Sequence, residues 1–374
     1  MPSQKPQQQA EPAQETVSLL ALDGQAIERF VQNLGWPKYR AQQILRWLYQ
    51  GRAHTIAQMT DLSMAERAIL ESRTTVGRSR HCRVLQAEDG TRKFLITLED
   101  GLTVETVLIP DGRRLTLCLS TQVGCTLDCT FCLTGAMGLK RNLKACEIVD
   151  QVLTVQDRLE PNTTLSSLVL MGMGEPLANL DSVAEAIARL TNRQWGLGIS
   201  AHRITLSTAG LASRLKEVAA LDVNLAISLN ASTQEQRAQL MPAVNRLFSL
   251  KQLLEACRAY PLPPRRRLTF EYVLLGGVND ADTDARRLVK LLVGIKCKVN
   301  LIPVKPFPGS PYQRPADGTV LRFQAILKQA GVDTFIRKSK GRDVLGACGQ
   351  LGNVPGLIPP QPILPTLTPA GAGC

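Results

Sequence analysis

Apolar residues recur at helical spacing in the first part of the chain. The pattern is clear over residues 27–34 and 44–48, and a Gly-Trp-Pro break over 35–37 separates the two runs. Such spacing is typical of amphipathic helices that bury one face. We therefore expect a small helical accessory domain over residues 18–74.

The rhythm then changes to the alternation that is typical of half-buried strands. Asp-Gly pairs at 89–90 and 100–101 are turn signals between the apolar runs. Three runs have this strand-like pattern: Cys82–Leu85, Lys93–Leu98 and Thr103–Ile109. We expect a β-extension over residues 75–114 that joins the helical domain to the remainder of the chain.

After Leu115, short apolar runs alternate with longer helical segments. The strand candidates are Leu115–Ser120, Ser167–Met171, Arg203–Ser207, Asn224–Leu229, Leu268–Leu274 and Lys298–Ile302. The helical candidates are Glu147–Arg158, Val183–Leu190, Leu250–Arg258 and Asp282–Leu292. This alternation predicts an α/β fold, a partial parallel (β/α)6 barrel over residues 115–353, since eight units usually need about 250 residues. In such a barrel the chemistry belongs at the carboxyl ends of the strands.

The two ends of the chain differ in composition from the rest. Residues 1–17 are rich in Gln and Pro, and residues 354–374 are rich in Pro, so we expect disordered tails that carry no chemistry. No run approaches the ~18 apolar residues of a membrane-spanning helix, and the first residues lack an apolar signal segment. These features favour a cytoplasmic protein with no membrane partner.

Basic residues outnumber acidic ones along the chain. The 374 residues include 44 Lys and Arg against 32 Asp and Glu, a formal net charge of +12. This charge favours polyanions, above all nucleic acid, and a membrane surface is the weaker interpretation. Aromatic residues make up only 4%, which argues against extended base-stacking platforms. Recognition of a nucleic acid would therefore depend on charge and shape.

Three of the ten cysteines, Cys125, Cys129 and Cys132, lie within eight residues, directly after the first barrel strand. Reduced thiols that bind metal or react are more plausible here than a disulfide framework, since the chain is large and lacks a signal segment. Three thiolates at this CxxxCxxC spacing can hold three corners of an iron–sulfur cube. A structural zinc site is the alternative, but it needs four ligands, and no matched fourth Cys or His lies nearby.

Four stretches of the chain carry a more specific signal: Arg114–Cys125, Met171–Leu177, Gly276–Asp280 and Ala347–Leu351. The cysteine motif resembles that of the radical S-adenosylmethionine (SAM) enzymes, in which an iron without a protein ligand chelates the amino and carboxylate groups of SAM. Together the four stretches resemble the RlmN/Cfr family of radical SAM RNA adenine methyltransferases, and RlmN most closely. The resemblance covers residues 20–353, in order and with similar spacing.

The resemblance implies roles for three residues outside the cluster motif. Cys348 would carry a methyl group from one SAM, and a radical made from a second SAM would take hydrogen from that group before it adds to the base. Glu105 would accept the proton from carbon 2 of the adenine. Cys118 would release the RNA by forming a disulfide bond with Cys348. Without the resemblance, Cys118 would be interpreted as a core residue and Glu105 as a solvated carboxylate.

A SAM site at the ends of later strands is also implied by the resemblance. Gly174 and Glu175 follow the second barrel strand in a Gly-Met-Gly-Glu-Pro motif and would bind the methionine part of SAM. Ser207, Ser228 and Asn230 match positions that contact its ribose and carboxylate. Lone cysteines are usually small buried side chains, and we expect this of the other cysteines of the barrel: Cys146, Cys257 and Cys297.

Two residues depart from the family pattern. Asn230 stands where a His is usual, and Lys305 stands where an Asn is usual. Asn230 can still donate a hydrogen bond, but it cannot replace a protonated imidazole. Lys305 would bring a positive charge beside cationic SAM or toward RNA phosphate.

The function that the resemblance implies is methylation of carbon 2 of adenine in 23S ribosomal RNA and in transfer RNA. The cofactors would be one 4Fe-4S cluster and SAM, with a low-potential electron donor such as flavodoxin or ferredoxin, and the protein would be a monomer. Two basic runs, Arg265–Arg267 and Arg337–Arg342, are candidates for phosphate contact. The second is a candidate because it lies shortly before Cys348 in the chain. The target adenine must leave its stack to reach a barrel interior.

Two other functions stay open on these observations. One is a radical SAM enzyme with another RNA modification, such as methylation of carbon 8 of adenine. The other is a non-catalytic iron–sulfur protein that binds RNA or assists assembly, for which the changes at Asn230 and Lys305 would be signs of lost activity. The presence of Glu105, Cys118 and Cys348 argues against this second alternative.

The net charge of +12 predicts that RNA affinity depends steeply on salt, because each neutralised phosphate releases a bound counterion. Fluorescence anisotropy with a labelled RNA stem-loop should show a large loss of affinity between low and moderate salt. A flat response would mean that the basic residues serve another purpose.

Overall fold

The computed structural model describes residues 16–161 and 163–352, which form two compact units. The smaller unit extends to Arg78 and also takes in the short segment Gln194–Gly196, and the larger unit contains the rest of the described chain. The predicted tails over 1–17 and 354–374 lie almost entirely outside the described residues. Val17 is the exception and belongs to a strand.

The smaller unit is the helical domain that the apolar spacing predicts. Its helices are α1 (Gly24–Asn33), α2 (Tyr39–Tyr49) and α3 (Met64–Arg73), and its two strands are β1 (Val17–Ser18) and β2 (Thr74–Thr75). Asp23 caps α1 by accepting a hydrogen bond from the Ala26 amide at 2.6 Å. The ring of Trp195, from the distant segment of this unit, lies 5.0 Å from that of Tyr49.

The first residues of this unit correct the predicted tail boundary. Val17 pairs with Thr74 and Ser18 with Thr75, in a short parallel ladder. Leu19 and Leu20 follow directly and are fully buried. The sequence offers no local signal for this strand because its partner comes some 55 residues later, after α3.

One ten-stranded sheet runs through the larger unit, in the order β14-β13-β12-β11-β10-β9-β6-β5-β4-β3. The antiparallel part consists of β3 (His81–Gln86), β4 (Arg92–Thr97), β5 (Thr103–Asp111) and β6 (Arg114–Cys118). The parallel part continues from β6 through β9 (Ser167–Leu170), β10 (Ile204–Thr208), β11 (Asn224–Ser228), β12 (Leu268–Leu274), β13 (Cys297–Pro303) and β14 (Thr334–Ile336).

The structure confirms the α/β class and the six predicted strand–helix units. The large sheet has one more parallel strand among the described residues, because the short strand β14 pairs with β13. Its three residues are too few for a period-2 pattern to stand out in the sequence. The β-extension is also part of the same sheet as the barrel, since β5 and β6 pair directly.

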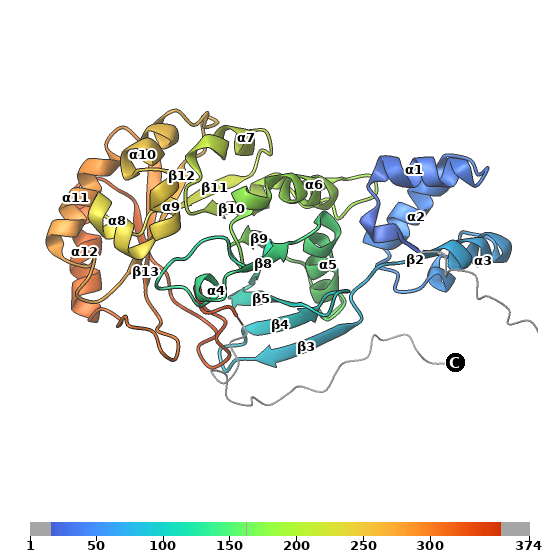
Figure 1. Cartoon of the computed structure of the whole chain (residues 1–374), viewed down its shortest axis with the longest axis horizontal. Helices are drawn as coiled ribbons and strands as arrows, with labels where there is room; N and C mark the ends of the chain where they lie inside the picture. The colour runs from blue at the N-terminus through green and yellow to red at the C-terminus, as the bar shows by residue number, and fades with distance from the viewer. Residues whose placement is uncertain (1–15, 162, 353–374) are drawn as a thin grey trace, which may run out of the picture. The chain divides into compact units, whose positions relative to one another are not determined.

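Helices cover the outer side of the parallel strands (Figure 1). They are α5 (Ala145–Gln156), α6 (Leu180–Thr191), α7 (Leu215–Ala219), α10 (Leu250–Arg258), α11 (Asp282–Leu292) and α12 (Asp317–Gln329). The short helices α8 (Gln234–Leu240) and α9 (Pro242–Leu247) pack instead at the carboxyl ends of the strands. Tyr272 of β12 packs on Phe323 of α12 with ring centroids 5.4 Å apart, and both are fully buried. This packing fixes the parallel strands whose carboxyl ends carry the site.

A small hairpin, which the sequence pattern does not reveal, lies between β6 and α5. Strands β7 (Gln122–Gly124) and β8 (Leu139–Asn142) pair with each other and leave the large sheet, and the short helix α4 (Leu133–Ala136) lies between them. The cysteine motif is therefore enclosed by a hairpin and is not an open loop.

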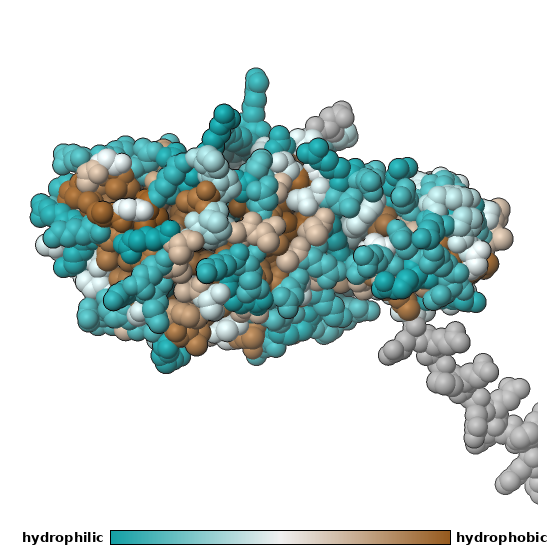
Figure 2. Space-filling model, turned by 90° about the horizontal axis from the view of Figure 1, so that it is seen from above, coloured by the Kyte–Doolittle hydropathy of each residue, from teal (hydrophilic) through white to brown (hydrophobic). Residues whose placement is uncertain are grey.

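No helix in the described part of the chain is both long enough and apolar enough to cross a membrane. On the face shown in Figure 2, hydrophobic side chains are interspersed with hydrophilic ones. The described chain also has single exposed apolar residues, such as Leu321 and Val293, which are normal on protein surfaces.

The packing predicts a large difference between two phenylalanines of the sheet. Phe270 of β12 is fully buried, and Phe335 of β14 is 49% exposed. Phe270→Ala should lower the free energy of unfolding by about 3–5 kcal/mol, because it leaves a cavity in the core. Phe335→Ala, the matched control, should cost less than about 1 kcal/mol.

Denaturant unfolding followed by circular dichroism measures both values. Tryptophan fluorescence is unsuitable because Trp36, Trp47 and Trp195 all lie in the smaller unit. Equal costs for the two variants would contradict this account of the core.

Candidate functional site

The cysteine motif lies at the carboxyl end of β6, where the barrel prediction expects the chemistry. Cys125, Cys129 and Cys132 are each partly buried. The Cys132 amide donates to the Cys129 carbonyl at 3.1 Å, and the Cys125 amide donates to the Gly138 carbonyl at 3.2 Å. These bonds fold the motif back on itself, so that the three thiols belong to one compact loop.

Helices α8 and α9 also hold this cluster loop through hydrogen bonds. The Thr130 amide donates to the Leu240 carbonyl at 3.0 Å, and Asp128 accepts from the Ala243 amide at 2.7 Å. Leu240 belongs to α8, and Ala243 belongs to α9. The two helices that follow β11 therefore fix the cluster loop.

Three cysteines are one ligand short of a closed zinc site and match the three protein-bound corners of an iron–sulfur cube. Among the described residues, no three His, Cys, Asp or Glu side chains converge closely enough to hold one metal ion. A zinc ion needs its ligands at about 2.0–2.3 Å from a single centre, whereas a cube binds each thiolate at a separate corner. The loop can hold such a cluster through Cys125, Cys129 and Cys132.

Burial keeps these thiols protonated in the absence of metal. It raises the pKa of Cys125 to about 12 and also raises the pKa values of Cys129 and Cys132. Iron must displace these protons, because only thiolates are good ligands. Metal binding would therefore release protons and depend on pH.

Arg237 places a positive charge beside the cluster loop, although it is fully buried. Its guanidinium donates to the carbonyls of Leu229 (2.8 Å) and Ala209 (2.6 Å), and no described carboxylate forms an ion pair with it. Burial lowers the pKa of Arg237 to about 10, and a negative charge on Cys129 opposes this shift. Thiolate ligands here would supply the missing negative charge. Sequence analysis missed Arg237, because its pattern is that of an ordinary polar residue of a helix.

The Gly-Met-Gly-Glu motif packs tightly against the start of the hairpin. Gly174 has φ +106°, and a Cβ there would lie 2.7 Å from the Cβ of Gln122, so glycine is required. Gln122 accepts hydrogen bonds from the Glu175 amide (2.9 Å) and the Thr126 amide (3.2 Å). It thereby couples the glycine motif to the cluster loop, a function that sequence analysis missed.

Each carboxylate oxygen of Glu175 accepts a hydrogen bond from the framework in this structure. Its carboxylate accepts from the backbone amides of Leu177 (3.0 Å) and Ala209 (2.8 Å), and burial raises its pKa. Each oxygen keeps further acceptor capacity, so a contact with SAM stays a prediction. The immediate effect of Glu175 is to tie the end of β9 to the end of β10.

The two serines of the predicted SAM site do come together, but Asn230 is used differently. Ser207 of β10 and Ser228 of β11 lie with their hydroxyl oxygens 3.5 Å apart. Asn230 is buried with φ +56°, accepts from the Val273 amide at 2.9 Å, and contacts the Met241 sulfur. Its side chain joins the residues after β11 to β12, and a contact between Asn230 and SAM stays a prediction.

The structure brings the two remote thiols into one region. Cys118 is buried at the end of β6, against Val107 and Leu351, and the side chain of Cys348 is exposed. Burial, and then the charge of Cys348, raises the pKa of Cys118. Both are free thiols, so the disulfide that the resemblance implies is not a feature of this structure.

Three of the hydrogen bonds that hold the Cys348 segment (residues 347–352) connect it to α4 and to Glu105. The Leu133 amide donates to the Gly349 carbonyl at 2.8 Å, and the Thr134 hydroxyl donates to the Leu351 carbonyl at 2.5 Å. The Gly352 amide donates to Oε2 of Glu105 at 3.1 Å. The segment thus connects the cluster loop to the predicted proton acceptor.

Glu105 is buried and not solvated as an isolated strand carboxylate would be. It lies on β5, is 2% exposed, and forms an ion pair with Lys93 of β4 at 3.3 Å. Sequence analysis did not single out Lys93, because it occupies an ordinary polar position in the alternation of its strand.

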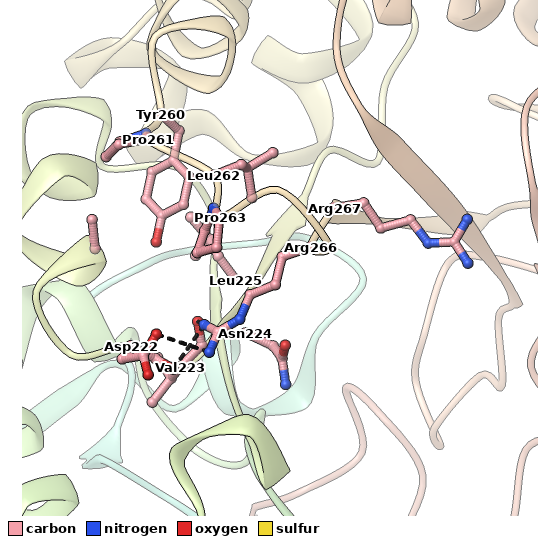
Figure 3. A pocket seen from close by; sticks show the side chains of 11 residues that line it. Asp222, Val223, Asn224, Leu225, Tyr260, Pro261, Leu262, Pro263, Arg266 and Arg267 are labelled. Carbon is pink, nitrogen blue, oxygen red and sulfur yellow. Dashed lines mark hydrogen bonds and ion pairs between the residues drawn. The ribbon is translucent and has the colours of Figure 1, made fainter.

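The two basic runs have different surroundings, and the first does not lie at the site. Arg266 donates to the carbonyls of Asp222 and Val223, forms an ion pair with Asp222 at 2.8 Å, and lines a pocket before the start of β11 (Figure 3). Arg267 pairs with Asp333. These groups lie at the amino ends of parallel strands, away from the cluster loop. Their charge is already neutralised.

The second run lies beside the Cys348 segment. Arg337, Lys338 and Arg342 are exposed, and Lys340 donates to the Pro110 carbonyl at 2.6 Å. Lys305, at the end of β13, donates to the Ser339 carbonyl at 3.4 Å, and burial lowers its pKa to about 8. Lys305 therefore holds the basic run 337–342 in place, and the exposed residues of this run can contact phosphate.

Comparison with known proteins defines the class first. Residues 119–289 match the Radical SAM superfamily, and residues 17–76 match the family described as Ribosomal RNA large subunit methyltransferase N-terminal domain. The crystal structure of a radical SAM methyltransferase from Sphaerobacter thermophilus is 41% identical with a TM-score of 0.85, covering 90% of this chain and 99% of that one. This is a radical SAM protein, a class that implies an iron–sulfur cluster and SAM.

Sequence relatives define the family within that class. The Dual-specificity RNA methyltransferase RlmN of Syntrophobacter fumaroxidans is 49% identical over 87% of this chain and 95% of its own length. The protein of the same name from Geobacter sulfurreducens is 44% identical over 96% of this chain and 95% of its own length. The chain belongs to the RlmN family.

The cluster assignment predicts a specific metal content. Protein reconstituted without oxygen should hold about four irons per chain, and Cys125→Ala, Cys129→Ala and Cys132→Ala should each lose the cluster. Iron and sulfide analysis with electron paramagnetic resonance measures this. Cys146→Ala, outside the loop, should keep the iron. One tightly bound zinc and no iron in the unchanged protein would contradict the assignment.

Proposed function

We propose that this protein methylates carbon 2 of adenine in 23S ribosomal RNA and in transfer RNA, by a radical SAM mechanism with Cys348 as the methyl carrier. The observation that carries the proposal is the gathering of Cys118, Cys348 and Glu105 beside the cluster loop, although the two thiols are 230 residues apart in the chain. The RlmN relatives, which are named dual-specificity RNA methyltransferases, support it. A generic radical SAM protein needs neither of the remote thiols.

The chemistry of adenine explains why such an enzyme needs thiols. Carbon 2 is electrophilic, and so is the methyl group of SAM, so that a direct transfer between them is unfavourable. A cysteine sulfur can first take the methyl group from SAM, because a thiolate is a strong nucleophile toward an electrophilic methyl group. When bound at Cys125, Cys129 and Cys132, a 4Fe-4S cluster with SAM would supply a radical able to remove hydrogen from the methylated carrier.

Cys348 suits the role of the carrier. Its side chain is exposed, while the nearby residues Ala347 and Gln350 are buried. Gly346 and Gly349 lie on either side and give the segment the backbone freedom to present the sulfur to more than one partner. Its thiol must lose a proton before the sulfur attacks, because the thiolate is the nucleophile.

Glu105 and Cys118 then release the product. Oε1 of Glu105 has no hydrogen-bond partner and is therefore available to accept the carbon-2 proton. The adduct must also lose its unpaired electron, which the cluster would accept when bound. The Cys118 thiolate then attacks the Cys348 sulfur and forms a disulfide; the sulfur–methylene bond breaks, and its electron pair goes to the carbon, which takes up a proton to become a methyl group. An external reductant must then restore the two thiols, and a low-potential donor such as flavodoxin or ferredoxin would also serve the cluster.

RNA contact is assigned to the exposed basic residues next to the Cys348 segment. Arg337, Lys338 and Arg342 would position phosphates, while the target adenine flips out of its stack toward the thiols. The burial of Glu105 and Cys118 requires this flipping, because neither group can reach a base within a helix. We also propose that the protein acts as a monomer in the cytoplasm.

The proposal predicts different fates for two cysteine variants. Cys348→Ala should make no product and carry no methyl group. Cys118→Ala should still attack the base but should remain covalently linked to RNA through Cys348, because no second thiol can open the thioether. Mass spectrometry of the Cys348 peptide and denaturing gels with labelled RNA measure both outcomes.

Cys257→Ala provides a matched control, since Cys257 is a buried cysteine on α10 that should not affect either readout. Normal turnover of Cys118→Ala, free of RNA, would overturn the mechanism and leave the cluster assignment intact. Nucleoside analysis that finds a methyl group at carbon 8 would replace carbon 2 as the site of reaction.

A further inference from the structure

The environment of Glu105 contains a second buried charge that the mechanism above does not use. Lys93 has no exposed side-chain surface, and its Nζ lies 3.3 Å from Oε2 of Glu105. No other ion pair of Lys93 or Glu105 occurs within the described chain. A buried lysine is costly unless it meets an opposite charge, so these two residues depend on each other.

Strand register explains why the two side chains meet next to the thiols. Lys93 is paired with Val107, and Val107 is paired with Cys118, so these three residues form one row across β4, β5 and β6. Glu105 lies two positions from Val107 on the same strand and thus on the same face of the sheet. The proton acceptor, its counter-ion and the resolving thiol therefore share one surface.

The Cys348 segment covers this surface. Leu351 packs with Val107 and Cys118, and Gly352 donates its amide hydrogen to Oε2 of Glu105 at 3.1 Å. Both described partners of the carboxylate, Lys93 and Gly352, thus hold the same oxygen. Oε1 is buried and has no hydrogen-bond partner.

We propose that Lys93 is a positioning residue for Glu105: it holds Oε2 as its counter-ion, so that Oε1 faces the carbon-2 proton of the RNA adenine. This inference rests on the proposed function and adds the residue that fixes its proton acceptor. Lys93 does not itself touch the reacting atoms. Without it, Glu105 would be a buried carboxylate with no opposite charge and with freedom to turn away from the base.

The test compares Lys93→Met, which keeps the length of the side chain but removes its charge, with Lys93→Arg, which keeps the charge. In single-turnover assays, Lys93→Met should methylate Cys348 normally and form the Cys348–RNA adduct. The adduct should then decay at least about tenfold more slowly, since a displaced general base loses part of its usual 10²–10⁴-fold effect. Lys93→Arg should recover most of the rate.

A double-mutant cycle separates positioning from a general effect on structure. If Lys93 acts through Glu105, adding Lys93→Met to Glu105→Gln should slow adduct decay by no more than about twofold beyond Glu105→Gln alone. Lys328→Met, which removes an exposed lysine from α12, is the matched control and should leave all rates unchanged.

Several outcomes would overturn the inference. One is a wild-type rate of adduct decay in Lys93→Met. Another is a further slowing of adduct decay, by more than about twofold, when Lys93→Met is added to Glu105→Gln. The third is an equal loss of Cys348 methylation and of adduct decay in Lys93→Met. If Lys93→Met does not fold, Lys93→Gln keeps a donor without the charge, and a wild-type rate there would also overturn it. Absence of any adduct or methylated base with the unchanged protein would instead reject the proposed function.

Discussion

The segment Ala347–Gly352 has no helix or strand of its own, and the thiol site depends on the hydrogen bonds that hold it in place. Gly349 and Leu351 accept hydrogen bonds from the start of α4, next to the cluster cysteines, and Gly352 donates to Glu105. Each bond is worth only about 1 kcal/mol. Together they place the proposed methyl carrier between the cluster loop and the proposed proton acceptor, while leaving the Cys348 side chain exposed.

The interior of the larger unit is rich in buried polar groups, and those nearest the site have structural partners. Arg237 binds strand-end carbonyls, Glu175 binds strand-end amides, and Lys93 pairs with Glu105. Burial of such groups is expensive without compensation. Such groups are useful at a reaction site, because fixed charges and dipoles act strongly on the reacting atoms where water is excluded.

A single sheet links the two parts of the larger unit, and this continuity has a consequence for the site. Since β5 pairs with β6, Glu105 on the antiparallel extension shares a face with Cys118 on the first parallel strand. The extension is therefore more than a connection between domains. It supplies the buried pair Lys93–Glu105 to a barrel that supplies the cluster loop and Cys118, the thiol proposed to resolve the adduct.

The sequence by itself determined the class of fold, most strands and helices, and the cluster cysteines, because periodicity and close spacing are local properties. It also predicted Glu105, Cys118 and Cys348, but only through family resemblance. Only the tertiary structure decided that Lys93 and Arg237 are buried charges, that Asn230 supports the fold, and that Arg266 is neutralised away from the site. These outcomes depend on partners that lie from about ten to more than forty residues away in the chain. The local sequence pattern around a residue does not show which distant residues it will contact.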